Sequence, residues 1–162
     1  NFSRSSKKSI SIDEFFYPLD KIKNWNSIYG KKGFISYQCS VPYKDAYKSI
    51  YEILTTIKKY KAYSFVSVLK SMKKKDFPLS FGQNGFTLVF DFPNYKDITK
   101  ILGKVDDIVL KYNGKIYLAK DSIISKKKFR NLNSEFYNPE FISLRKKNNY
   151  FFNSIQSKRL GL

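Results

Sequence analysis

The sequence predicts an α+β fold in which two amphipathic helices cover one face of a four-stranded antiparallel sheet. Apolar side chains alternate with a period of two in short segments and recur with helical spacing in two longer ones, and these segments follow one another as β-α-β-β-α-β. A chain of 162 residues, 42% of them hydrophobic and 18% aromatic, can bury a core as one domain.

The N-terminal residues are expected to form an arm and then a short helix. Residues 1–12 are rich in Ser and Lys, so we predict a disordered or linking arm there and a domain over residues 13–162. Pro18 opens an amphipathic segment that Gly30 ends, which predicts a short helix. Because the chain does not begin with Met, we expect a fragment of a longer protein.

The next segments predict a strand, a helix and a second strand. Side chains alternate over Phe34–Val41, and Pro42 ends this pattern. Apolar residues recur with helical spacing over about Tyr43–Lys59, and Ser64–Ser71 is a Phe- and Val-rich strand. The lysine-rich segment Met72–Asn84 is expected to be a loop, long enough for mobility or a binding role.

The following segments complete the pattern. Gly85–Phe92 alternates as a third strand, and Tyr95–Tyr112 carries an apolar helical stripe that a left-handed cap at Asn113-Gly114 ends. Lys115–Ala119 predicts a short fourth strand, and short helices follow from Ser122 onward. The order predicts a ferredoxin-like sheet with both helices on one face, plus a helical C-terminal extension.

Alternation assigns the strand residues to two faces. The helix-covered face is predicted to carry Ile35, Tyr37, Cys39, Phe86, Leu88, Phe90, Ile116 and Leu118. The opposite face is predicted to carry Ser36, Gln38, Ser40, Thr87, Val89, Asp91 and Tyr117. Lys70 and Lys120 lie at strand ends, where a small shift in register decides their side. This second face can be solvated or form the wall of a ligand site, and the residues alone leave both alternatives open.

The chain is strongly basic, with 31 Lys and Arg against 13 Asp and Glu and a net charge of +18. Such a charge attracts nucleic acid, anionic lipid or phosphorylated small molecules. The lysines are scattered, with short clusters at Lys73–Lys75 and Lys126–Lys128, so we interpret them as a solvated surface. A nucleic-acid-binding module and a pure interaction or structural domain stay open as alternatives.

Few residue types suited to catalysis are present. With no His and a single Cys, the chain offers no Ser-His triad, usual metal site or internal disulfide. The acid-base candidates are Lys70, Lys120, Tyr117 and Asp121, although Lys120 and Asp121 could equally form a structural ion pair. Cys39, on the predicted core face, is interpreted as a packing residue rather than a reactive thiol.

Several stretches, taken in order along the chain, resemble one family. They run from about Phe15 to Leu162 and are Phe16–Asp20, Trp25–Gly30, Tyr37-Gln38 before Pro42, Ser64–Lys70, Leu79–Phe81, Gly85–Pro93, Gly114–Ser122 and Lys158–Leu162. Together they resemble the C-terminal half of the FAD-linked oxidases of the vanillyl-alcohol-oxidase superfamily. The most similar branch is that of the decaprenylphosphoryl-β-D-ribose 2′-oxidases.

The resemblance implies that this chain is the C-terminal substrate (cap) domain of a two-domain enzyme. In the family, an N-terminal domain binds FAD and the substrate domain lays a sheet over the flavin ring. That FAD-binding domain lies outside this chain, so we expect it to hold FAD and we expect the chain alone to be inactive. Lys120 matches the lysine that reaches flavin and substrate, and Tyr117 matches the tyrosine three positions before it. Catalytic and cofactor-binding roles are implied for both.

Substrate-binding residues are implied in the same way. Gln38 matches a site glutamine and Lys70 a site lysine. Thr87 stands where sugar-phospholipid oxidases often have Asn, and Val89 where some have Cys, which leaves the substrate open. The implied reaction is hydride transfer to flavin from a hydroxyl of a sugar-phosphate lipid or a related sugar. A domain of an aldonolactone oxidase-type flavoenzyme is an alternative, but those related oxidases usually carry a His-Trp-Gly-Lys stretch near the C-terminus, whereas this chain has no His.

The expected partners follow from this resemblance and from the charge. They are the FAD-binding domain of the same protein and a sugar substrate, free or linked to a lipid phosphate, with no specific nucleic acid. The charge would suit an anionic membrane surface, so we expect a cytoplasmic protein, with peripheral contact at the inner membrane face as a further hypothesis.

Overall fold

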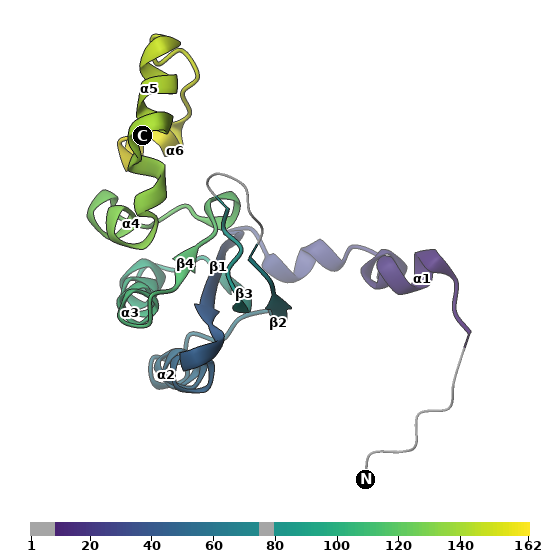
Figure 1. Ribbon diagram of the computed structural model, residues 1–162. Coiled ribbons are helices and arrows are strands. Elements are labelled where there is room, and N and C mark those ends of the chain that lie inside the picture. Colours follow the sequence, from purple (N-terminus) through teal and green to yellow (C-terminus); the bar gives the residue numbers. More distant parts are fainter. Residues whose placement is uncertain (1–8, 75–79) are drawn as a thin grey trace. The chain divides into compact units, whose positions relative to one another are not determined.

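The computed structural model describes residues 9–74 and 80–162, and the chain divides into two units, Asn1–Lys31 and Lys32–Leu162 (Figure 1). The described part of the first unit has one short helix, α1 (Ile12–Phe16), followed by 3₁₀ turns at Pro18–Lys21 and Trp25–Tyr29. The prediction of a single helix in this segment is wrong, because Asn24 has a left-handed φ of 54° that interrupts the helical path. The predicted domain boundary after residue 12 stays a prediction.

The second unit contains the four-stranded sheet. Its strands are β1 (Phe34–Pro42), β2 (Val66–Met72), β3 (Gly85–Pro93) and β4 (Lys115–Ile116). They lie in the order β2-β3-β1-β4, and all three pairings are antiparallel. The α+β prediction with a ferredoxin-like sheet is confirmed.

Two long helices, α2 (Ala46–Lys59) and α3 (Ile98–Lys111), pack on one face of this sheet (Figure 1). Every strand residue predicted for that face contributes to the core. Tyr37, Cys39, Leu88, Phe90 and Ile116 are buried, and Ile35, Phe86 and Leu118 are partly buried against them. The helix-covered face is therefore the apolar one that alternation predicts.

The C-terminal extension forms three short helices, α4 (Lys126–Leu132), α5 (Pro139–Lys147) and α6 (Ile155–Leu160). Phe129 of α4 and Leu160 of α6 are fully buried in the core that the sheet and the long helices share. These two helices are thus anchored to the body of the unit.

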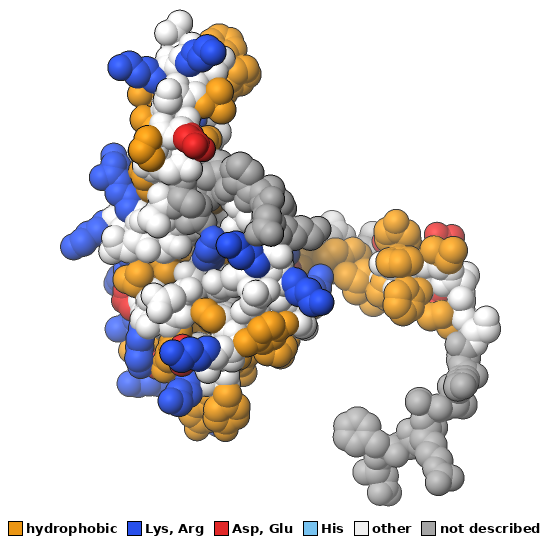
Figure 2. Space-filling model, in the orientation of Figure 1, with side chains coloured by type: hydrophobic (Ala, Val, Ile, Leu, Met, Phe, Trp, Pro, Cys, Tyr) orange, Lys and Arg blue, Asp and Glu red, His pale blue; other side chains and the backbone are white. Residues whose placement is uncertain are grey.

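The basic side chains are distributed over the second unit rather than gathered in one place. In the view of Figure 2 they lie over several elements, with few acidic side chains between them. This distribution fits the interpretation of a lysine-rich solvated surface. None of the helices among residues 9–74 and 80–162 is both long and apolar enough to cross a membrane.

A buried hydrogen bond links the sheet to the helix layer. The hydroxyl of Tyr37 in β1 donates to Oδ1 of Asp106 in α3 at 2.9 Å, and both side chains are buried. Burial raises the pKa of Asp106 to about 6, although the Tyr37 hydrogen bond and the charge of Lys128 act in the opposite direction. The core therefore contains a carboxyl group whose pKa, about 6, lies well above the usual value for Asp.

We predict that Asp106 makes the fold less stable as the pH rises from about 4 to 7. Its folded pKa of about 6 exceeds an unfolded value of about 3.9, so the stability it contributes is present below pH ~4 and is lost as the pH rises through ~6. Two pKa units correspond to about 2–3 kcal/mol. Urea unfolding at several pH values should show this slope, and Asp106→Asn should flatten it. Identical profiles for the two proteins would contradict the prediction.

Candidate functional site

The face of the sheet opposite the helices carries the residues that alternation predicts for it. Gln38 of β1 pairs with Val89 of β3, and Thr87 of β3 pairs with Lys70 of β2. The Tyr117 N–H donates to the Gln38 carbonyl oxygen at 2.9 Å, which continues the β1–β4 pairing by one residue. Because directly paired residues project to the same side of a sheet, these five side chains share one face. We call it the polar face.

Thr87 organises the centre of the polar face. Its Oγ1 accepts a hydrogen bond from Nε2 of Gln38 at 3.1 Å and donates to the carbonyl oxygen of Cys39 at 2.9 Å. Only 2% of Thr87 and 7% of Val89 is exposed. The Thr87 hydroxyl is thus occupied within the chain, where it orients the Gln38 amide. Direct contact of Thr87 and Val89 with a ligand stays a prediction.

Residues after the undescribed segment 75–79 lie on the β4 side of the polar face. The ring of Phe81 contacts that of Tyr117, with centroids 4.8 Å apart. Lys115 Nζ donates to the Ser80 carbonyl oxygen at 3.0 Å. The polar face is therefore not simply solvated along its whole width. This contact was not foreseen from the sequence, where Met72–Asn84 gives only the composition of a loop.

Lys120 does not lie on a strand. β4 ends at Ile116, earlier than predicted, and Leu118–Lys120 forms a 3₁₀ turn in which the Lys120 N–H donates to the Tyr117 carbonyl oxygen at 3.0 Å. Lys120 thus follows Tyr117 by one turn, and no strand pairing places it on the polar face. The Asp121 carboxylate forms an ion pair with Arg159, with Nη2 and Oδ2 2.6 Å apart. The partner of Asp121 is thus Arg159 and not Lys120, the partner that the sequence suggested as an alternative.

The chain has a relative among proteins of known activity. No model of a protein family matches the chain. The chain is similar to the decaprenylphosphoryl-β-D-ribose oxidase of Mycolicibacterium smegmatis, with 34% identity over 113 residues. This chain is a relative of an oxidase. The match covers 69% of the chain but only 24% of the oxidase, so the chain corresponds to a part of its relative. The resemblance stated from the motifs is confirmed.

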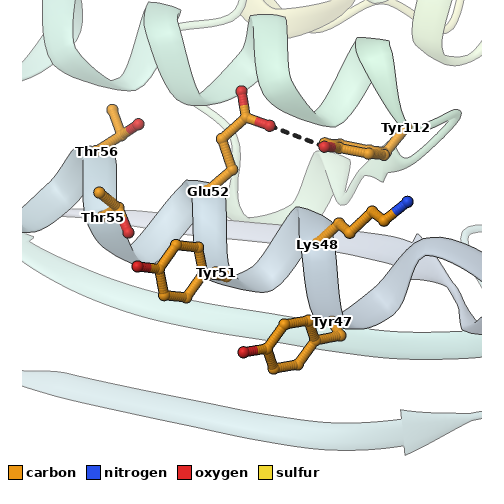
Figure 3. Close-up of a pocket in the computed structure, with 7 residues that line it drawn as sticks. All are labelled: Tyr47, Lys48, Tyr51, Glu52, Thr55, Thr56 and Tyr112. Carbon is orange, nitrogen blue, oxygen red and sulfur yellow. Dashed lines mark hydrogen bonds between the residues drawn. The ribbon is translucent and has the colours of Figure 1, made fainter.

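A separate groove lies on the helix layer of this oxidase relative, between α2 and α3 (Figure 3). Glu52 of α2 accepts hydrogen bonds from Lys111 Nζ at 2.8 and 3.1 Å and from the Tyr112 hydroxyl at 2.9 Å. These bonds hold the pKa of Glu52 below its usual value. The Glu52 carboxylate is therefore paired within the chain, and we interpret its contacts with Lys111 and Tyr112 as a link between the two helices.

Burial accounts for the single thiol of the chain. Cys39 is fully buried on the core face, and burial, with a smaller contribution from Asp106, raises the pKa of its thiol to about 12. It packs in the core, as predicted. Within the part of the chain that the structure describes, no cluster of three or more His, Cys, Asp or Glu side chains could hold a metal ion.

We predict that Thr87→Val destabilises the chain by about 1–3 kcal/mol, because both hydrogen bonds of a buried hydroxyl are lost while the volume is kept. Thr87→Ser is the matched control, since it keeps the hydroxyl and loses only a methyl group. Urea unfolding of both variants measures the difference. A Thr87→Val variant as stable as the serine variant would show that the hydroxyl does not organise the face.

Proposed function

We propose that this chain is the C-terminal substrate domain of an FAD-dependent oxidoreductase that oxidises a sugar hydroxyl by hydride transfer to flavin. The observation that carries the proposal is the 34% identity to decaprenylphosphoryl-β-D-ribose oxidase. The polar face supports it independently, since alternation and strand pairing put Gln38, Lys70 and Tyr117 on one face of the sheet without reference to any relative. A domain with such a face contributes one wall of a site.

The residues of the polar face fit a flavin and a sugar by their chemistry. Tyr117 is about one-third exposed and presents an aromatic ring with a hydroxyl at the β4 edge of this face, and Lys70 is exposed on β2 at its other edge. The Oγ of Ser40, on the same face, is buried and has no hydrogen-bond partner among the described residues. Such donors and acceptors suit a ligand rich in hydroxyl and carbonyl groups. Tyr117 and Lys120 would hold the flavin side, and Gln38 and Lys70 the sugar side.

The chain's own residues would bind, orient and stabilise charge. FAD, when bound, supplies the acceptor for the hydride. Because one N–H of the Gln38 side-chain amide is donated to Thr87, the orientation of that amide is fixed, and its side-chain Oε1 would accept a hydrogen bond from a sugar hydroxyl. The Lys120 ammonium would stabilise negative charge as that hydroxyl loses its proton. Thr87 and Val89 would lie beneath the sugar, and the Thr87 hydroxyl would orient the Gln38 amide that binds it.

A phosphate-bearing sugar is the substrate class that the charge favours. The net charge of +18 attracts anions, and Lys70 lies exposed at the edge strand β2, where a phosphate could reach it. We propose a sugar-phosphate lipid or a related sugar as the substrate. The same charge would draw the protein to an anionic membrane surface.

The proposed partner is an FAD-binding domain in the same polypeptide. Apolar side chains that a domain normally buries are exposed in this chain, among them Phe151, with 81% of its surface exposed, and Ile155, with 90%. In the first unit no described residue is buried, although Phe15 and Phe16 are apolar. Exposed apolar surface of this kind supports a covering partner.

The decisive experiment uses the full-length parent protein loaded with FAD. A polyprenylphosphoryl ribose should bleach the flavin absorbance under anaerobic conditions. Lys120→Ala should slow this reduction by about 10²-fold or more, the range expected for loss of a group that assists proton transfer. Lys127→Ala, an exposed lysine of α4, is the matched control and should leave the rate unchanged.

Two results would contradict the proposal at different levels. A parent protein that binds no flavin, or whose flavin no sugar reduces, would refute the function itself. Reduction of the Lys120→Ala variant at the wild-type rate would refute the role of Lys120 while leaving the function intact.

A further inference from the structure

The Asp121 carboxylate lies immediately after the turn that carries Lys120, and it is almost fully buried, with 2% of its side chain exposed. Its Oδ1 accepts the backbone N–H groups of Ile123 at 3.0 Å and Ile124 at 2.9 Å. Its Oδ2 accepts Nη2 of Arg159 at 2.6 Å. Both carboxylate oxygens thus hold the chain in a bend directly behind Lys120.

Helix α6 holds the same turn from the other side. Nε2 of Gln156 donates to the carbonyl oxygens of Leu118 at 2.8 Å and Asp121 at 2.9 Å, which lie at the two ends of the turn. Arg159 Nη1 also donates to the carbonyl oxygen of Ile124. Gln156 and Arg159 are three residues apart, so they project from one face of the helix.

Helix α6 is itself held in place by contacts at both of its ends. A capping box between Ser154 and Ser157 closes its N-terminus, and Leu160 near its end is fully buried. The Tyr137 hydroxyl donates to the Leu160 carbonyl oxygen at 2.9 Å. The helix is therefore a fixed support for the turn rather than a loose tail.

We propose that Asp121, together with Gln156 and Arg159, is a positioning residue that sets where Lys120 stands relative to Tyr117. On one side the turn is tied to β1 by the hydrogen bond from Tyr117 N–H to Gln38, and on the other side it is tied to α6. The catalytic consequence rests on the proposed function, but the positioning can be tested without it.

The test of positioning uses this chain and amide hydrogen exchange. Gln156→Met keeps the length of the side chain and removes both donors, and Asp121→Asn removes the charge. Each should raise the exchange rate of the Lys120, Ile123 and Ile124 amides by about tenfold or more, while the amides of β1 and β3 keep their protection. Asp97→Asn, which removes an exposed ion pair with Lys100, is the control and should change none of them.

Two outcomes would overturn the inference. One is unchanged exchange in the turn of Gln156→Met. The other is an equal rise throughout the sheet, which would mark a general loss of stability. If Asp121→Asn does not fold, Gln156→Met still decides, because Gln156 is partly exposed and carries no charge.

A second arm measures the consequence in the full-length flavin-loaded protein. With a polyprenylphosphoryl ribose as the probe, Gln156→Met should lower the rate of flavin reduction at saturating sugar by about tenfold, with little change in KM and in thermal unfolding. Faster amide exchange in the turn at Lys120 with an unchanged rate of flavin reduction would support the positioning by Gln156 and refute the proposed role of Lys120. The two failures are therefore distinguishable.

Discussion

The antiparallel pairing of β1 with β3 is the constraint on which the rest of the molecule depends. It runs from Phe34 opposite Pro93 to Pro42 opposite Gly85, with a proline at an end of each strand. A shift by one residue would carry every side chain of β1 to the other face. The core and the polar face would then exchange members, so a single register places Cys39 in the core and Gln38 on the polar face.

Two neighbouring residues of β1 donate side-chain hydrogen bonds on opposite faces of the sheet. Tyr37 reaches into the helix layer and donates to Asp106, whereas Gln38 lies on the polar face and donates to Thr87. The central strand is thus fixed by polar contacts on both sides as well as by apolar packing. The geometry of the proposed site is consequently tied to the packing of α3.

Much of this arrangement could be predicted from the sequence because burial of one face imposes a local period on the residues. The alternation at Phe34–Val41 and Gly85–Phe92 was sufficient to assign both faces, and the order of elements was sufficient for the sheet topology. The turn at Lys120 could not be predicted in this way. It depends on Arg159, which lies 38 residues beyond Asp121, and no local pattern reports such a contact. The burial of Thr87 likewise depends on residues outside its own strand.

The single cysteine can report when the core between the sheet and the helices opens. Cys39 lies in the inner strand β1 with none of its surface exposed, and its thiol stays protonated at neutral pH. Since only a thiolate attacks disulfide reagents quickly, labelling of Cys39 requires that β1 separate from the helices above it. The rate at which Cys39 is labelled therefore measures how often the helix-covered face of the sheet becomes exposed, and the measurement needs no engineered cysteine.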